Sequence, residues 1–171
     1  MNRKELKVTM SKEAHLCKVL AKKLLKAGLT ARNTVIVTVS TDYSSVVGQF
    51  LRHALSFEGE ICDGFGIDVP YPDESWTERY VYELNRAFDN NSHLFGQGQI
   101  LLLVEAGVIR GGNYKFVTEF IKNEYEARYR TLALFENRGS AYKSDFVGEY
   151  YDNETQDLTF WWEMPNNHWE T

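Results

Sequence analysis

The apolar positions of this chain switch repeatedly between a helical spacing and short continuous runs. The helical spacing predicts helices from a cap at Ser11 to Gly28, over 46–55 and 76–88, and from about Lys115 to Glu126. Continuous or β-branched runs predict strands over 34–39, 100–104 and 131–135, with extended pieces after Ile61, over 146–151 and over 159–162. This alternation predicts an α/β fold with a mostly parallel twisted sheet flanked by helices.

The most informative stretch is QILLLVEAGVIRGGNY, residues 99–114. Its apolar run predicts a buried parallel strand that ends at Glu105, and a glycine-rich turn then leads into the next helix. Open α/β sheets bind ligands at this edge. The backbone amides of Arg110, Gly111, Gly112 and Asn113, together with the guanidinium of Arg110, would suit a phosphate at a helix N-terminus. The alternative is that the glycines only let the chain turn.

A second candidate loop follows the strand over 34–39. The polar segment STDYSS, residues 40–45, predicts a loop that opens on the same sheet edge as the glycine-rich turn if the two strands are parallel. Thr41, Asp42 and Tyr43 are therefore candidate ligand-loop residues.

Composition narrows the class of protein. A chain of 171 residues that is 43% hydrophobic fits one domain, and its formal charge of -5 argues against a nucleic-acid partner. The two cysteines lie far apart without metal-ligand spacing. The polar N-terminal stretch and the lack of a long apolar run lead us to expect a cytoplasmic protein without a membrane partner.

Three stretches resemble type I phosphoribosyltransferases of the purine branch, which includes the hypoxanthine-guanine and xanthine-guanine enzymes. The first, VTMSKEAHLCKVLAKKLLKAG with the later TVIVTVS, is similar to the family's entry helix and first strand. The second, LLLVEAGVIRGGN, resembles the ribose-phosphate signature, and the third, DFVGEYYDNETQDLTFWWEMP, resembles the C-terminal hood. The resemblance implies a single phosphoribosyltransferase-like domain over 1–171, with a core over about 8–140 and a hood over about 141–171.

The resemblance also implies roles for individual residues. Glu105 falls on the first acidic position of the signature, which makes it the catalytic candidate. Arg110, Gly111 and Asn113 fall on the phosphate loop. Trp161 falls on the aromatic residue that stacks on the base, with Glu163 and Pro165 after it. Family chemistry further implies Mg²⁺ bound to the pyrophosphate of phosphoribosyl pyrophosphate if the protein is active.

Several positions depart from the family pattern. Ala106 and Ile109 replace two carboxylates, and neither side chain can exchange a proton with a purine. Asp42 would repel a pyrophosphate. The lysine that reads the purine oxygen is absent, and Arg138 would have to donate in its place.

Three hypotheses follow from this pattern. The first is a protein that binds a nucleobase or nucleotide and transfers phosphoribose to a purine-type base. The second is a catalytically degenerate relative that serves as a nucleotide-binding or protein-interaction module, for which the aromatic C-terminus would suit core packing or a homodimer. A generic Rossmann-type binder is weaker because the chain has no GxGxxG motif.

Overall fold

The computed structural model describes residues 3–39, 41–56, 60–69, 76–96 and 98–163. Its helices are α1 (Met10–Lys26), α2 (Thr41–Leu55), α3 (Trp76–Asn90) and α4 (Gly112–Glu124), with short 3-10 turns η1 (Ser92–Leu94) and η2 (Trp161–Glu163). Its strands are β1 (Lys4–Val8), β2 (Thr34–Val39), β3 (Gly64–Ile67), β4 (Ile100–Val108), β5 (Tyr129–Asn137), β6 (Phe146–Tyr151) and β7 (Gln156–Phe160).

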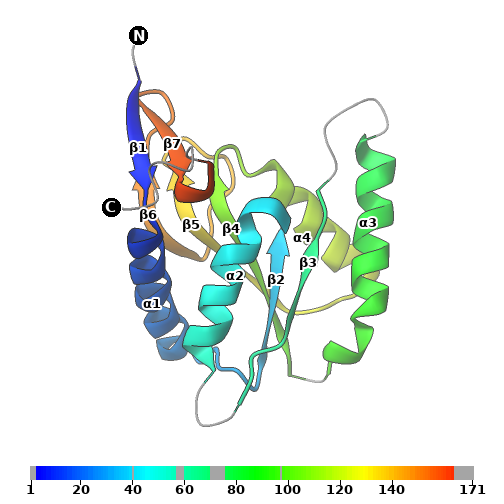
Figure 1. Cartoon of the computed structure of the whole chain (residues 1–171). Coiled ribbons are helices and arrows are strands. Elements are labelled where there is room, and N and C mark those ends of the chain that lie inside the picture. The colour runs from blue at the N-terminus through cyan, green and yellow to red at the C-terminus, as the bar shows by residue number, and fades with distance from the viewer. Residues whose placement is uncertain (1–2, 40, 57–59, 70–75, 97, 164–171) are drawn as a thin grey trace.

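Five strands form the main sheet in the order β3-β2-β4-β5-β6, and every neighbouring pair is parallel. The helices α1 and α2 cover one face of this sheet, and α3 and α4 cover the other (Figure 1). Each face has its own apolar core, and the central strands β2 and β4 contribute to both. The predicted α/β fold with a parallel sheet flanked by helices is confirmed.

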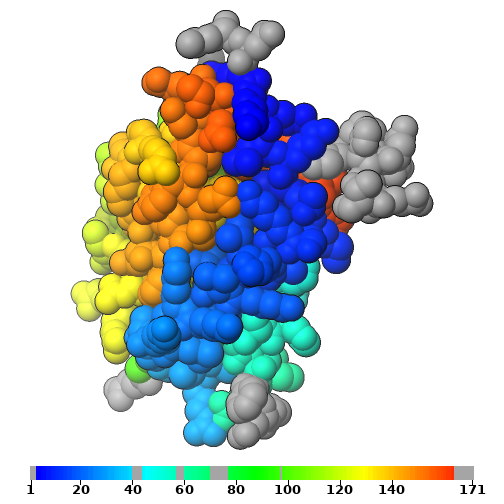
Figure 2. Space-filling view, turned by 90° about the vertical axis from the view of Figure 1, so that its left-hand side faces the viewer, coloured from blue at the N-terminus to red at the C-terminus, as the bar shows by residue number. Residues whose placement is uncertain are grey.

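The first and last strands form a separate two-stranded parallel ribbon, in which Val8 pairs with Phe160. We call β1 and β7 the terminal ribbon. It lies above the main sheet beside the carboxyl ends of β4, β5 and β6 (Figure 1). Figure 2 shows β6, in orange, beside the blue helix α1 on one side of the molecule. The region predicted as a hood contains β6, which is the edge strand of the main sheet, and β7, which pairs with β1.

Three local predictions were wrong. Thr9, not Ser11, caps α1, because its hydroxyl oxygen accepts a hydrogen bond from the Lys12 N–H at 3.2 Å. The segment predicted as a loop over 40–45 is helical from Thr41 onward. Serine, threonine and aspartate favour both loops and first helical turns, so their presence did not separate the two. Finally, β4 continues to Val108, which places Glu105 inside the strand.

In the part of the chain that the structure describes, no helix is both long enough and apolar enough to cross a membrane.

Candidate functional site

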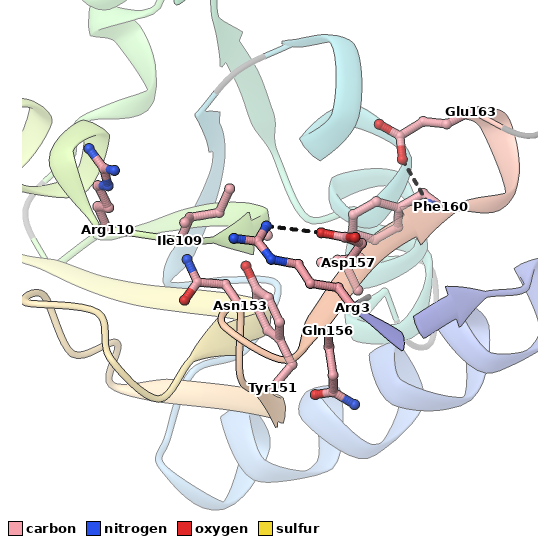
Figure 3. A pocket seen from close by; sticks show the side chains of 11 residues that line it. Arg3, Ile109, Arg110, Tyr151, Asn153, Gln156, Asp157, Phe160 and Glu163 are labelled. Atoms are coloured by element: carbon pink, nitrogen blue, oxygen red, sulfur yellow. Dashed lines mark hydrogen bonds and ion pairs between the residues drawn. The ribbon is translucent and has the colours of Figure 1, made fainter. Parts of the chain in front are cut away.

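A pocket of about 460 Å³ lies between the carboxyl end of β4 and the terminal ribbon (Figure 3). We call it the ribbon pocket. It is lined by Arg3, Gly107, Ile109, Arg110, Tyr151, Asn153, Gln156, Asp157, Leu158, Phe160 and Glu163. These residues come from both ends of the chain and from its middle, so the pocket exists only because the terminal ribbon closes over the parallel sheet. Its position at the carboxyl edge of parallel strands is the usual place for a ligand in such sheets.

Close contact between β4 and the terminal ribbon forms one wall of this pocket. A β-carbon added at Gly107 would lie 3.3 Å from Leu158 Cδ2 and 3.7 Å from the Phe160 ring. The Phe160 ring also lies against Phe135 of β5, with centroids 5.9 Å apart. A glycine in β4 therefore lets the ribbon approach the sheet closely.

The polar groups of the ribbon pocket include both charge signs. Arg3 Nη1 lies 3.1 Å from Asp157 Oδ1. Because both side chains are at least half-exposed, this ion pair contributes little to stability. Glu163 Oε2 accepts a hydrogen bond from the Phe160 N–H at 2.8 Å, which holds η2 against the end of β7. Arg110 stands at the far edge of the pocket from the Arg3–Asp157 pair (Figure 3).

The predicted phosphate turn lies at the start of α4. Gly111 is the N-cap residue with a φ of 78°, and a β-carbon there would lie 2.3 Å from Tyr142 Cβ. Gly112 is exposed, and no atom lies within 4 Å of the place that its β-carbon would occupy. Arg110 is exposed and lines the ribbon pocket. The structure thus brings Arg110 and the N-terminus of α4 together, while phosphate binding there stays a prediction.

Glu105 lies on the opposite side of β4 from the pocket. Its side chain is 5% exposed and lies near Tyr80 and Tyr114, which belong to the core under α3 and α4. Burial raises the pKa of Glu105 to about 8, and a hydrogen bond from the Asn113 side chain limits that rise. Its Oε1 atom has no hydrogen-bond partner among the described residues. Glu105 is therefore a neutral interior acid near pH 7, and it does not line the ribbon pocket.

The three predicted base-binding residues are separated in the structure. Glu163 lines the ribbon pocket, whereas the Arg138 guanidinium lies over the Tyr150 ring, 5.5 Å from its centroid. Trp161 Nε1 donates a hydrogen bond to Glu13 Oε2 at 2.8 Å. Pro165 lies outside the described residues. The interaction with Glu13 fixes Trp161 against α1, so base stacking and a homodimer through this aromatic segment both stay predictions.

The acid that anchors Trp161 was not identified from the sequence. Glu13 is fully buried in the first turn of α1, and burial raises its pKa to about 7, while the hydrogen bond from Trp161 limits the rise. Its spacing from Cys17 and Leu20 on the buried face of α1 was the available signal. A second residue that was missed is Ser44, whose hydroxyl oxygen accepts a hydrogen bond from the Ala106 N–H at 3.2 Å.

The remaining predicted residues, Thr41, Asp42 and Tyr43, occupy the first turn of α2, and their side chains lie outside the described part of the structure. Of the two positions where the family carries carboxylates, Ala106 is buried in the core under α1 and α2. The other, Ile109, is 52% exposed in the ribbon pocket.

No protein-family model matches the chain, and no curated protein matches it by sequence. Solved structures do match it. A purine phosphoribosyltransferase from Pyrococcus horikoshii aligns over 94% of this chain and 95% of its own, with a TM-score of 0.68 and 16% identity. The xanthine-guanine-hypoxanthine phosphoribosyltransferase from Helicobacter pylori aligns over 94% of each chain, with a TM-score of 0.64 and 13% identity. The chain has the fold of the purine phosphoribosyltransferases.

A third match is a hypothetical protein from Neisseria gonorrhoeae with bound ppGpp. It aligns over 97% of this chain and 93% of its own, with a TM-score of 0.72 and 13% identity. All three alignments cover nearly the whole chain. At these identities the likeness establishes the fold and leaves the activity to be argued from the site.

Proposed function

We propose that this phosphoribosyltransferase-like protein binds a nucleotide in the ribbon pocket and does not transfer phosphoribose. One observation carries the proposal: Arg110, two residues before the first residue of α4, lines one edge of a pocket of about 460 Å³ whose other edge holds amide and carboxylate side chains. That volume lies within the range of small-molecule sites. The pocket therefore offers separate places for an anionic group and for a hydrogen-bonding base.

The edge beside Arg110 suits a phosphate. The first backbone N–H groups of a helix have no partner within the helix, and the helix dipole places partial positive charge there. Gly112 is exposed at this position, so a ligand oxygen meets no side chain on its approach. The Arg110 guanidinium adds a full positive charge and a planar pair of donors. Together these groups form an anion site.

The edge at the terminal ribbon suits a base with both donors and acceptors. The side chains of Asn153 and Gln156 are amides, which both donate and accept hydrogen bonds. Asp157 accepts, and its partner Arg3 donates. Phe160 and Leu158 supply apolar contact beside these groups. A purine-type base fits this combination of donors, acceptors and apolar side chains, and we include a purine-type base in the proposal.

The position of Glu105 supports binding without transfer. Phosphoribosyl transfer builds positive charge on the ribose, which an ionised carboxylate near the sugar stabilises. Glu105 is buried under α3 and α4 with a pKa raised to about 8, so it is neutral near pH 7. Ala106 and Ile109 carry no charge, and α2 is helical from Thr41, where a pyrophosphate loop would be needed.

The residues also do not fit a resident magnesium ion. Mg²⁺ is bound mainly by carboxylate and phosphate oxygens. In the ribbon pocket, Asp157 is paired with Arg3 and Glu163 accepts from the Phe160 N–H. Within the described ranges, no group of three or more histidine, cysteine, aspartate or glutamate residues is placed to hold a metal. Magnesium would be required only if the protein were active.

Phosphoribosyl transfer is the second candidate, because two carboxylates, Asp157 and Glu163, line the ribbon pocket and would face a bound sugar or base. Titration calorimetry with a purine nucleoside monophosphate, next to a pyrophosphate-release assay with phosphoribosyl pyrophosphate, Mg²⁺ and purine bases, separates the two. We expect the monophosphate to bind and no pyrophosphate to appear. Pyrophosphate release would establish transfer, and the absence of nucleotide binding would favour a protein-interaction module.

The variant Arg110→Ala tests the phosphate edge. We expect it to weaken binding of the monophosphate by about 1 to 3 kcal/mol, the range for hydrogen bonds to charged groups. Lys18→Ala is the matched control, because it removes one positive charge from an exposed position on α1. Equal affinities of the Arg110→Ala variant and the parent would remove Arg110 from the site.

A further inference from the structure

A second cavity of about 460 Å³ lies at the opposite edge of the main sheet, where β4 and β5 begin. We call it the basic groove. It is lined by Ile100, Ala127, Arg128, Tyr129, Arg130, Tyr142, Lys143 and Asp145. Ten residues of nearly extended chain separate Ile100 from Arg110, so the groove lies about 30 Å from the phosphate edge of the ribbon pocket. The two cavities are therefore independent sites.

Positive charge dominates the lining of this groove. It has three cationic side chains and a single carboxylate, in a protein whose net charge is -5. That carboxylate, Asp145, is already engaged, because its Oδ2 accepts from the Thr131 N–H at 2.8 Å and from the Thr131 hydroxyl at 3.1 Å. Lys143 Nζ donates to the Arg138 carbonyl oxygen at 2.9 Å and lies 3.8 Å from Glu136 Oε1. The other two cationic residues of the groove are Arg128 and Arg130.

Neither Arg128 nor Arg130 makes a side-chain hydrogen bond or an ion pair within the part of the chain that the structure describes. Both are exposed and stand two residues apart at the start of β5. Two unpaired guanidinium groups at this spacing repel each other, and an anion between them would relieve that repulsion. Arginine's planar donors also match the oxygens of a phosphate.

The walls of the basic groove are fixed and partly apolar. The Tyr129 ring lies under Lys122 Nζ, which is 5.8 Å from the ring centroid. The Tyr142 ring packs 5.3 Å from that of Tyr114. A cleft with walls of low dielectric and charge of one sign concentrates the electric field. The groove is thus built before any ligand arrives.

We propose that the basic groove is a second binding site, which takes the phosphate group of a small phosphorylated compound between Arg128 and Arg130. Lys143 also lines the groove, but its ammonium group lies beside the Arg138 carbonyl and Glu136 at the other end of β5, so the two arginines supply the charge of the site. The site is distinct from the ribbon pocket, so a compound bound there would lie at the end of the sheet where β4 and β5 begin. Ligand occupancy of one cavity does not exclude occupancy of the other.

Inorganic pyrophosphate is the probe for this site, followed through backbone amide chemical shifts at constant ionic strength. The titration uses the Arg110→Ala variant, so a failure of nucleotide binding in the ribbon pocket does not affect the result. We expect saturable shifts at residues 128–131 and 143–145. Adding Arg128→Ala and Arg130→Ala should raise the half-saturating concentration by about tenfold or more, as expected for lost charge-assisted hydrogen bonds.

The control adds Lys4→Ala and Lys18→Ala instead, which removes the same charge from exposed positions outside the groove. This control should saturate at the same pyrophosphate concentration as the Arg110→Ala background. The proposal is wrong if the groove amides do not shift in that background. It is equally wrong if the arginine and lysine variants weaken binding to the same degree, because the attraction would then be a general effect of net charge.

Discussion

The two sides of the carboxyl end of β4 differ in what fills them. On the side of α4, Glu105 is buried near Tyr80 and Tyr114, and Gly111 packs against Tyr142. On the side of the terminal ribbon, Gly107 and Ile109 border a pocket of about 460 Å³. One side is interior protein, and the other is open to a ligand.

This difference separates two parts of the segment 99–114, which are Glu105 and the glycine-rich turn that follows it. The acidic position that the family resemblance assigns to the ribose has become a neutral interior group. Arg110 and Gly112 stay exposed at the start of α4. This division agrees with the proposed binding of a nucleotide without transfer, because an exposed helix start attracts anions whatever the packing of the interior.

Gly111→Ala should have the largest effect on the closed side. Alanine disfavours the left-handed conformation that Gly111 adopts, and its β-carbon would lie 2.3 Å from Tyr142 Cβ. We expect the free energy of unfolding to fall by about 2 to 4 kcal/mol, measured by urea denaturation. The control, Gly112→Ala, has open space and should change stability by less than about 1 kcal/mol. Similar losses in both variants would mean that the turn does not pack against Tyr142.

Glu105→Gln should have an effect of similar size, and this effect should depend on pH. The folded protein holds the Glu105 proton up to a pKa of about 8, whereas the unfolded chain releases it above about 4.5. The parent therefore loses stability as pH rises between these values. At pH 9 the glutamine variant should be more stable than the parent by about 3 to 5 kcal/mol, and at pH 4 the two should be nearly equal. A constant difference across this range would contradict a buried neutral Glu105.

The sequence predicted most of the fold because its central strands are unambiguous. TVIVTV and ILLLV are short apolar runs typical of buried strands, and their alternation with helical segments favours a parallel sheet. The terminal ribbon was not predicted, since β1 alternates charged and apolar residues over a short stretch and pairs with a strand about 150 positions away.

The candidate site was less predictable for a related reason. A continuous apolar run hides which residues face which side, so the direction of Glu105 could not be determined from its place after Val104. The contact between Trp161 and Glu13 joins residues from opposite ends of the chain. Nothing local in either segment indicates the other.

Glu13→Gln gives the corresponding test on the ribbon side, with a smaller expected effect. The folded-state pKa of Glu13 is about 7, so the parent should lose stability between about pH 4.5 and 7 and little more above that. We expect the glutamine variant to gain about 2 to 3 kcal/mol at pH 8. Trp161→Phe removes the donor that lowers this pKa, and the pH midpoint should therefore rise. An unchanged midpoint would show that Trp161 does not stabilise the Glu13 carboxylate.

Gly107→Ala should have the smallest effect and tests how firmly the terminal ribbon sits on β4. The added carbon would meet the Leu158 Cδ2 methyl at 3.3 Å, and this methyl ends a flexible side chain that can shift slightly. Because alanine also lowers the backbone entropy of the unfolded chain, the unfolding free energy should change by less than about 1 kcal/mol. Gly148→Ala in β6 is the contrasting variant, since its β-carbon would lie 2.5 Å from the Leu134 carbonyl oxygen, which cannot move away. If Gly107→Ala proved as costly as Gly148→Ala, the ribbon would be a rigid part of the core, and the pocket beside it could not adjust to a ligand.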